Sequence, residues 1–221
     1  MDLQQIKLVI FDWDGTVMDS IGKIVASIQQ AAARLDIAVP PAEQAKQIIG
    51  LSLDPAFRRL FPNSSQQQRD ELSAHYKDVY LNHDQTPTPL FPDAHDLFQT
   101  LHQHGYLLAV ATGKARRGLD RMMSETNTEH FFHSSRCSDE AQSKPHPDML
   151  QQLLAYHQLE PWQAVMIGDT VHDLAMAQAI NMPRIGITHG VHGLDDFAPH
   201  EPTAVVHSLA ELRLLLTGRT N

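Results

Sequence analysis

The amino-acid sequence predicts an α/β fold, in which a doubly wound, Rossmann-like parallel sheet carries an inserted α-helical cap domain. From about residue 89 onward, short apolar runs that end in polar residues alternate with amphipathic segments. This alternation is typical of parallel strands joined by crossover helices. Between the first apolar run and that region, the periodicity is helical only. We therefore expect a core formed by residues 1–16 and 89–221 and a cap formed by residues 17–88.

The composition indicates a folded, globular protein, with 42% hydrophobic and 19% charged residues. A formal net charge of -9 with only 17 lysines and arginines argues against nucleic acid or an anionic membrane as partner. Cys137 is the single cysteine, so no internal disulfide can form, and a reducing compartment is expected. The first seven residues lack the features of a signal sequence, which favours the cytoplasm. A monomer or homodimer would be ordinary for this size.

The first apolar run, residues 7–11, is rich in branched and aromatic side chains and stops at an acidic segment. This pattern predicts a buried strand that enters a loop. Two carboxylates with one residue between them on an extended segment point the same way, so Asp12 and Asp14 can share one site. Gly15 allows a sharp turn after them. The acidic pair is therefore expected at the carboxyl end of the first strand.

The segment that follows is predicted to be helical. Ser20 is placed to cap a long amphipathic helix, and Asp54, followed by proline, to cap another. A further helix is expected from Ser65 to Leu81. Residues 84–92 contain three prolines, which favour extended or turn conformations, so we place the end of the cap there.

Beyond this boundary, strands and helices are expected to alternate. Asp93 is predicted to cap a helix that ends at His104. The predicted strands cover residues 107–111, 133–137, 164–167, 184–187 and 204–206. The predicted helices among them cover residues 115–125, 147–157 and 174–180. Because doubly wound sheets bind ligands outside the carboxyl ends of their strands, the functional residues are expected there.

Further polar groups follow three of these strands. Thr112 and Gly113 come after the second strand of the chain, and Lys144 lies near the third. A hydroxyl, an unobstructed backbone N–H and a lysine charge can together neutralise a phosphoryl group in a transition state. Phosphoryl transfer depends chiefly on such positioning and electrostatics. Asp169 and Asp173 follow the fourth strand.

The acidic residues at these strand ends also predict a metal site. A hard cation such as Mg²⁺ prefers oxygen ligands and usually binds one or two carboxylates together with substrate phosphate and water. The expected protein ligands are the Asp12 carboxylate, the main-chain carbonyl of Asp14 and Asp169.

Four segments in order resemble the four motifs of the haloacid dehalogenase superfamily: DWDGT at residues 12–16, ATGK at 111–114, KP at 144–145 and GDTVHD at 168–173. Each is short, but the ordered set is highly specific, and the resemblance covers essentially the entire chain. The inserted segment resembles the helical cap of the phosphoglycolate phosphatase and phosphoglucomutase branch. The resemblance implies a cytoplasmic, Mg²⁺-dependent phosphatase acting on a small phosphorylated metabolite, either phosphoglycolate or a sugar phosphate.

The same resemblance implies a role for each residue. Asp12 would attack phosphorus to form an aspartyl-phosphate, while Asp14 would first donate and then accept a proton. The expected phosphate ligands are Thr112, Gly113 and Lys144. The expected metal ligands are Asp12, Asp14 and Asp169, supported from behind by Asp173 and Thr170. In relatives, the loop that matches residues 50–52 faces the active site, and nearby basic residues that are candidate substrate contacts are Lys23, Arg58 and Arg59.

Other functions stay open at this point. A sugar-phosphate mutase uses the same aspartyl-phosphate and differs mainly in cap residues. A signalling receiver domain also places an acidic cluster, a threonine and a lysine on a doubly wound sheet, although it has no cap. The dehalogenase and phosphonatase branches of the family lack the second acid of the first motif, which is Asp14 here, and are disfavoured.

Overall fold

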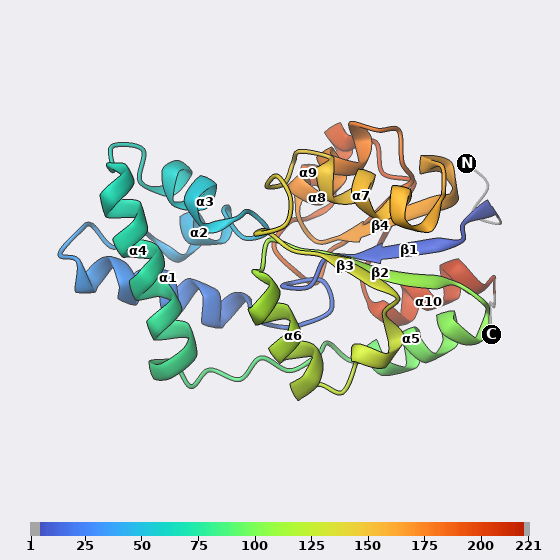
Figure 1. Ribbon diagram of the computed structural model, residues 1–221, viewed down its shortest axis with the longest axis horizontal. Coiled ribbons are helices and arrows are strands. Elements are labelled where there is room, and N and C mark those ends of the chain that lie inside the picture. Colours follow the sequence, from blue (N-terminus) through green and yellow to red (C-terminus); the bar gives the residue numbers. More distant parts are fainter. Residues whose placement is uncertain (1–4, 219–221) are drawn as a thin grey trace.

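The computed structural model describes residues 5–218 and has two parts, a sheet covered by helices and a helical lobe beside it (Figure 1). Residues 1–4 and 219–221, which include both ends of the predicted core and most of the segment inspected for a signal sequence, lie outside the described residues. In the described part of the chain, no helix is both long and apolar enough to cross a lipid bilayer.

Six parallel strands form the sheet in the order β3-β2-β1-β4-β5-β6. Their bounds are β1 Leu8–Phe11, β2 Leu107–Ala111, β3 Ser134–Arg136, β4 Ala164–Gly168, β5 Arg184–Ile187 and β6 Ala204–Val206. The predicted α/β class is confirmed, and every predicted strand is present. The order is that of a Rossmann-type sheet, whereas receiver domains have the order 2-1-3-4-5. The topology therefore counts against the receiver alternative.

Helices cover both faces of the sheet (Figure 1). Val9 and Phe11 of β1 face one apolar layer, and Leu8 and Ile10 face the other, as the two-residue period of a strand requires. The first layer contains residues of α5 (Ala94–Gln103), α6 (Arg116–Glu125) and α10 (Leu209–Thr217). The second contains residues of α7 (Asp148–His157) and α8 (Val171–Gln178). The short helix α9 (Leu194–Phe197) follows β5.

The helical lobe, residues 21–83, has an apolar core of its own. It is built from α1 (Ile21–Arg34), α2 (Ala42–Lys46), α3 (Leu53–Leu60), α4 (Gln66–Asp78) and the π-helical turn η2 (Val79–His83). Buried side chains from these helices form a separate cluster centred on Ile28, Phe57 and Leu72. The helix predicted to end at Leu81 thus ends as α4 at Asp78 and continues as η2.

Two connections join the lobe to the sheet, and they pair with each other. The amide of Asp19 donates to the carbonyl of Pro89 over 2.8 Å, and the amide of Phe91 donates to the carbonyl of Val17 over 3.0 Å. Met18 and Leu90 form an antiparallel bridge between these bonds. The chain therefore enters and leaves the lobe through one short ribbon, which we call the connecting ribbon.

Of three predicted helix caps, Ser20 and Asp93 occupy the N-cap position without making a capping bond, and Asp54 is misplaced. Ser20 precedes α1, but its hydroxyl donates to the Asp14 carboxylate and makes no capping bond. Helix α3 begins at Leu53, one residue before Asp54, so that Ser52 occupies the N-cap position. Asp93 precedes α5 in a left-handed conformation, with φ 66°, and its side chain accepts no capping bond. In each case, the tertiary environment or the backbone conformation overrides the local preference of the residue type.

Candidate active site

The carboxyl ends of β1, β2 and β4 bring the sequence-predicted residues together. Phe11, the last residue of β1, pairs with Val110 on one side and with Ile167 on the other. The three strands therefore end at nearly the same level. Consequently, the segments that begin at Asp12, Thr112 and Asp169 meet at one edge of the sheet.

Asp12 lies at the centre of this edge and is 1% exposed. Its Oδ1 atom accepts a 2.6 Å hydrogen bond from the amide of Trp13 and lies 2.9 Å from Nζ of Lys144. Its Oδ2 atom is also buried, yet it has no hydrogen-bond partner among the described residues. A buried carboxylate oxygen without a partner is unusual, because its desolvation is not compensated. One oxygen of Asp12 is thus held in place and the other is available to a ligand.

Lys144 joins two of the acidic residues. Its Nζ atom donates a 2.6 Å hydrogen bond to Oδ1 of Asp173, in addition to its contact with Asp12. Burial alone would lower the pKa of Lys144, but the carboxylates of Asp12 and Asp173 outweigh it and raise that pKa. The other oxygen of Asp173 accepts bonds from the amide and the hydroxyl of Thr170, over 3.1 and 2.7 Å. Asp173 and Thr170 therefore lie behind Lys144 and fix its position.

Asp169 is fully buried and held from both sides. The hydroxyl of Thr16 donates to its Oδ1 atom over 2.7 Å, and the amide of Val191 donates to its Oδ2 atom over 3.0 Å. Gly15 and Gly190 pack so closely on the carboxylate that a Cβ atom at either position would clash with it. Gly15 also has φ 82°, a conformation that side chains disfavour. Gly15 thus allows the sharp turn after the acidic pair and also leaves room for the carboxylate of Asp169.

The charge of this edge favours a bound cation. Asp12, Asp169 and Asp173 each offer an oxygen atom, and these atoms lie within 4.8 Å of one another. Lys144 is the one lysine or arginine that forms ion pairs with these carboxylates among the described residues. Burial raises the pKa of Asp12 to about 7 and raises that of Asp169 well above its ordinary value. Oxygen ligands and excess negative charge are what a divalent cation such as Mg²⁺ requires, so the residues fit the ion.

Asp14 is set apart from this cluster. Its Oδ1 atom accepts a 2.6 Å hydrogen bond from the hydroxyl of Ser20, and its Oδ2 atom lies 3.1 Å from Nζ of Lys114. Nζ of Lys114 also lies 5.2 Å from the centre of the Tyr80 ring, which belongs to the lobe. The predictions from sequence include neither Ser20 nor Lys114 as a partner of Asp14. Lys114 directly follows Thr112 and Gly113 in the sequence, and this position was the signal that could have identified it as a residue of the site.

Thr112 and Gly113 lie where the lobe meets the sheet. The hydroxyl of Thr112 accepts a 3.2 Å bond from the amide of Lys114. A Cβ atom built on Gly113 would lie 2.5 Å from the carbonyl oxygen of Gly50 and 2.9 Å from that of Leu51. The loop of the lobe that was expected to face the active site therefore packs against the end of β2, and only a glycine leaves room for it.

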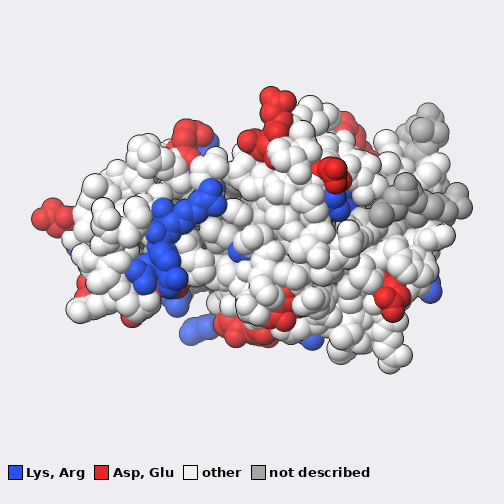
Figure 2. All heavy atoms as spheres, turned by 90° about the horizontal axis from the view of Figure 1, so that it is seen from above, with Lys and Arg blue, Asp and Glu red and all other residues white. Residues whose placement is uncertain are grey.

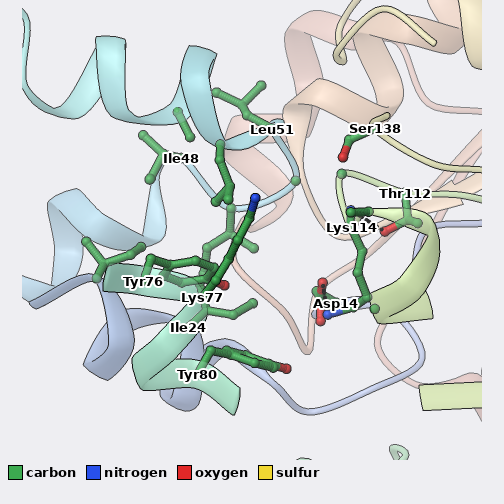
Figure 3. A pocket seen from close by; sticks show the side chains of 18 of the residues that line it. Asp14, Ile24, Ile48, Leu51, Tyr76, Lys77, Tyr80, Thr112, Lys114 and Ser138 are labelled. Carbon is green, nitrogen blue, oxygen red and sulfur yellow. Dashed lines mark hydrogen bonds and ion pairs between the residues drawn. The ribbon is translucent and has the colours of Figure 1, made fainter. Parts of the chain in front are cut away.

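A cavity of about 680 Å³ lies between the lobe and the sheet (Figure 3). Asp12, Asp14, Thr112, Gly113 and Lys114 line its sheet side. Its lobe side is lined mainly by apolar and aromatic residues: Ile24, Ile28, Ile48, Ile49, Leu51, Leu53, Ala56, Phe57, Tyr76, Tyr80 and Leu81. Lys77 is the one lysine or arginine of the lobe among the described lining residues, and the proposed contacts Lys23, Arg58 and Arg59 are not among them.

The chain matches the family model of the haloacid dehalogenase-like hydrolases over residues 9–187. It is 28% identical over 220 residues to a phosphoglycolate phosphatase of Vibrio vulnificus, an alignment that covers 96% of each chain. It is 32% identical over 211 residues to a probable phosphatase, IndB, of Dickeya dadantii, covering 93% of this chain and 91% of that one.

Solved structures agree with this match at the level of the fold. A predicted phosphoglycolate phosphatase of Haemophilus somnus superimposes with a TM-score of 0.86 and is 22% identical. The superposition covers 96% of this chain and 98% of the other. The sheet and the lobe are therefore both found in that structure.

Proposed function

The chain belongs to the haloacid dehalogenase-like hydrolases, and we propose that it hydrolyses a phosphoric monoester through an aspartyl-phosphate formed on Asp12. The observation that carries this proposal is the unpartnered Oδ2 atom of Asp12 in a residue that lines the cavity. The other oxygen of the same carboxylate is fixed by Trp13 and Lys144. A nucleophile held in this way loses little orientational freedom when it attacks.

In the first half-reaction, a carboxylate oxygen of Asp12 attacks phosphorus, and the bond from phosphorus to the ester oxygen breaks. Asp14 lines the same cavity and donates its proton to the departing alkoxide, which leaves as the alcohol. Thr112, Gly113 and Lys144 are the proposed partners of the phosphoryl oxygens, through a hydroxyl, an amide and an ammonium group.

In the second half-reaction, water attacks phosphorus, and the bond between phosphorus and Asp12 breaks. Asp14, now a carboxylate, accepts the proton of that water, and inorganic phosphate departs. The contacts of Asp14 with the Ser20 hydroxyl and with the Lys114 ammonium group hold its side chain in one orientation, and the ion pair with Lys114 forms when Asp14 is a carboxylate. The two steps restore the enzyme and consume one water for each ester.

Mg²⁺ is the proposed cofactor, with Asp12, the main-chain carbonyl of Asp14 and Asp169 as protein ligands. When bound, it would neutralise the negative charge that accumulates on the phosphoryl oxygens and on the buried carboxylates. Both oxygens of Asp173 already accept hydrogen bonds, from Lys144 and Thr170. This supports a role for Asp173 behind the metal ligands.

We further propose that residues 17–88 act as a cap over a catalytic core formed by residues 1–16 and 89–221. The separate apolar cluster of the lobe and the contact between Gly50 and Gly113 support this division. A cap that closes over the cavity would exclude water from the first half-reaction.

The test is steady-state release of inorganic phosphate from a panel of phosphomonoesters, with phosphoglycolate as the reference substrate because relatives carry that name. Turnover of many equivalents in Mg²⁺ is expected, together with loss of at least about 10³-fold in Asp12→Asn. Asp19→Asn, an exposed aspartate on the connecting ribbon, is the matched control. A mutase would convert a sugar phosphate into its isomer without net phosphate release, and a receiver would stop near one equivalent.

A further inference from the structure

The lobe side of the cavity differs from what a small substrate with two anionic groups needs. In phosphoglycolate, one methylene separates the phosphate ester oxygen from a carboxylate, and such a group requires a cation or several hydrogen-bond donors. The wall opposite Asp12 instead presents buried isoleucines from two parts of the lobe: Ile24, Ile28, Ile48 and Ile49. A carboxylate against this wall would lose its hydration without compensation.

The cations that line the cavity do not change this balance. Lys114 is committed to Asp14 at 3.1 Å. Lys77, Arg117 and Arg121 also line the cavity, but all three are exposed, and Arg121 pairs with Glu125 over 2.6 Å. Figure 3 shows Lys77 extending from the lobe across the cavity from Lys114. An ion pair made by an exposed lysine or arginine is weak, because water screens it. On the face seen in Figure 2, basic side chains gather over the lobe, but among the described residues Lys77 is the one lysine or arginine of the lobe that lines the cavity.

The size of the cavity is the second observation. Its volume of about 680 Å³ lies within the range of about 300–1,000 Å³ that is typical of sites for drug-sized ligands. A two-carbon acid would leave most of it unfilled. The aromatic rings of Tyr76 and Tyr80, 5.8 Å apart, form part of the wall and offer flat apolar surface. The cavity therefore has both the volume and the surface for a ring or a long alkyl group.

A buried polar group lies within this mainly apolar surface. The hydroxyl of Tyr80 is buried and has no hydrogen-bond partner among the described residues. Burial raises the pKa of Tyr80 and outweighs the nearby ammonium group of Lys114, which lowers it, so the hydroxyl keeps its proton and can donate. A buried hydroxyl without a partner in a ligand cavity points to a ligand that supplies one.

We infer that the substrate is a phosphomonoester of a bulky, mainly apolar alcohol, whose body lies against the isoleucine wall and whose single polar substituent meets the hydroxyl of Tyr80. This inference rests on the proposed phosphatase function and names the leaving group of that reaction. The phosphate binds beside Asp12, and the remainder of the ester fills the lobe side of the cavity.

The test compares phosphate esters of unactivated alcohols, so that the chemical step stays the same while the apolar body grows. Ethyl, butyl, hexyl and 2-phenylethyl phosphate are assayed beside phosphoglycolate. Each added methylene is expected to raise kcat/KM about threefold, as long as the longer alkyl chain contacts more of the isoleucine wall. Values that do not depend on chain length, or a kcat/KM for phosphoglycolate equal to that for hexyl phosphate, would overturn the inference.

Two matched variants locate the effect. Leu53→Arg introduces a cation at a half-buried position of the wall, and Val39→Arg introduces the same charge at a position that is 50% exposed and outside the cavity. Leu53→Arg is expected to lower kcat/KM for hexyl phosphate at least about tenfold without lowering that for phosphoglycolate. Val39→Arg should change neither value. Equal losses for both substrates in Leu53→Arg would contradict a role in selecting the leaving group.

A binding measurement separates this inference from the proposed function. Hexylphosphonate and 3-phosphonopropionate carry a bond that the enzyme cannot hydrolyse, so their effect on the melting temperature needs no turnover. Hexylphosphonate should stabilise the Mg²⁺-loaded protein more. If no ester is hydrolysed but this order holds, the proposed function fails and the apolar site stands. If esters are hydrolysed but the order is reversed, the inference fails alone.

Discussion

The ammonium group of Lys144 lies 2.9 Å from the carboxylate of Asp12, and the two side chains are 0% and 1% exposed. Removal of one partner from a buried ion pair leaves an uncompensated charge. Lys144→Met should therefore lower the free energy of unfolding by about 3 kcal/mol at pH 8. The loss should be smaller at pH 5, where Asp12 can take up a proton.

Urea denaturation in EDTA at both pH values measures this difference. Lys7→Met, a change at an exposed lysine next to β1, provides the control for the loss of a positive charge. Equal losses of unfolding free energy at the two pH values would show that Lys144 does not stabilise the ionised form of Asp12.

The proposed role of Asp14 as proton donor predicts that its effect on the rate depends on the leaving group. An alkyl phosphate leaves as a basic alkoxide and needs a proton, whereas 4-nitrophenyl phosphate leaves as a stable anion. Asp14→Asn should reduce kcat about 10²- to 10⁴-fold for the alkyl ester and much less for the nitrophenyl ester when formation of the aspartyl-phosphate limits the rate. Pre-steady-state release of the alcohol isolates this step, and Asp19→Asn serves as control. A uniform loss for both esters would instead indicate a positioning role for Asp14.

The raised pKa values predict how Mg²⁺ affects stability. Burial raises the pKa of Asp12 from 3.8 to about 7, so between these values the unfolded chain releases a proton that the folded chain retains. The metal-free protein therefore loses stability as the pH rises through this window. Mg²⁺ competes with protons for the same oxygens and should stabilise the protein more at pH 8 than at pH 5.

At a hundredfold excess over its Kd, the ion should raise the melting temperature by about 5–10 °C at pH 8. Thermal denaturation with and without EDTA checks this value. In Asp169→Asn, the side-chain carbonyl can still accept from the Val191 amide while the NH2 group donates to the Thr16 hydroxyl, and one charge is removed, so the variant should abolish most of the shift. A shift that is equal at both pH values would argue that the ion binds elsewhere.

The contact between Gly113 and the carbonyl of Gly50 predicts a closure defect. In Gly113→Ala, the new methyl group would meet a backbone atom that cannot rotate away. We expect kcat/KM to fall at least about tenfold while the melting temperature changes by less than about 3 °C, because the strain is relieved when the loop moves away from the sheet. Gly22→Ala, where the added methyl group meets nothing within 4 Å, is the control. Full activity of Gly113→Ala would show that the loop does not need this approach.

Much of the sheet could be predicted from the sequence, because its strands are short apolar runs followed by polar residues. The strands at residues 107–111, 184–187 and 204–206 have the predicted bounds. The gathering of Asp12, Thr112 and Asp169 followed from topology alone, since parallel strands present their carboxyl ends at one edge. Their chemical roles stay proposals that the measurements above address.

What sequence patterns missed depends on contacts between distant segments. Serine is a residue type that is typical of helix caps, yet the hydroxyl of Ser20 donates to Asp14 because the connecting ribbon places the two residues side by side. Ile24 and Ile28 belong to the amphipathic helix predicted after Ser20, and they pack in the core of the lobe, but the same side chains also line the cavity. No periodicity distinguishes an apolar side chain that packs on a neighbouring helix from one that faces a ligand.

The connecting ribbon has a consequence for how such proteins can diversify. Because the chain enters and leaves the lobe at adjacent points, residues 21–83 can be exchanged for another module without altering the order of the strands. Asp12, the proposed nucleophile, and Lys144 belong to the part that stays, whereas the isoleucine wall belongs to the part that is exchanged. A transplanted lobe would thus transfer a preference for one alcohol over another and leave the phosphorus chemistry untouched.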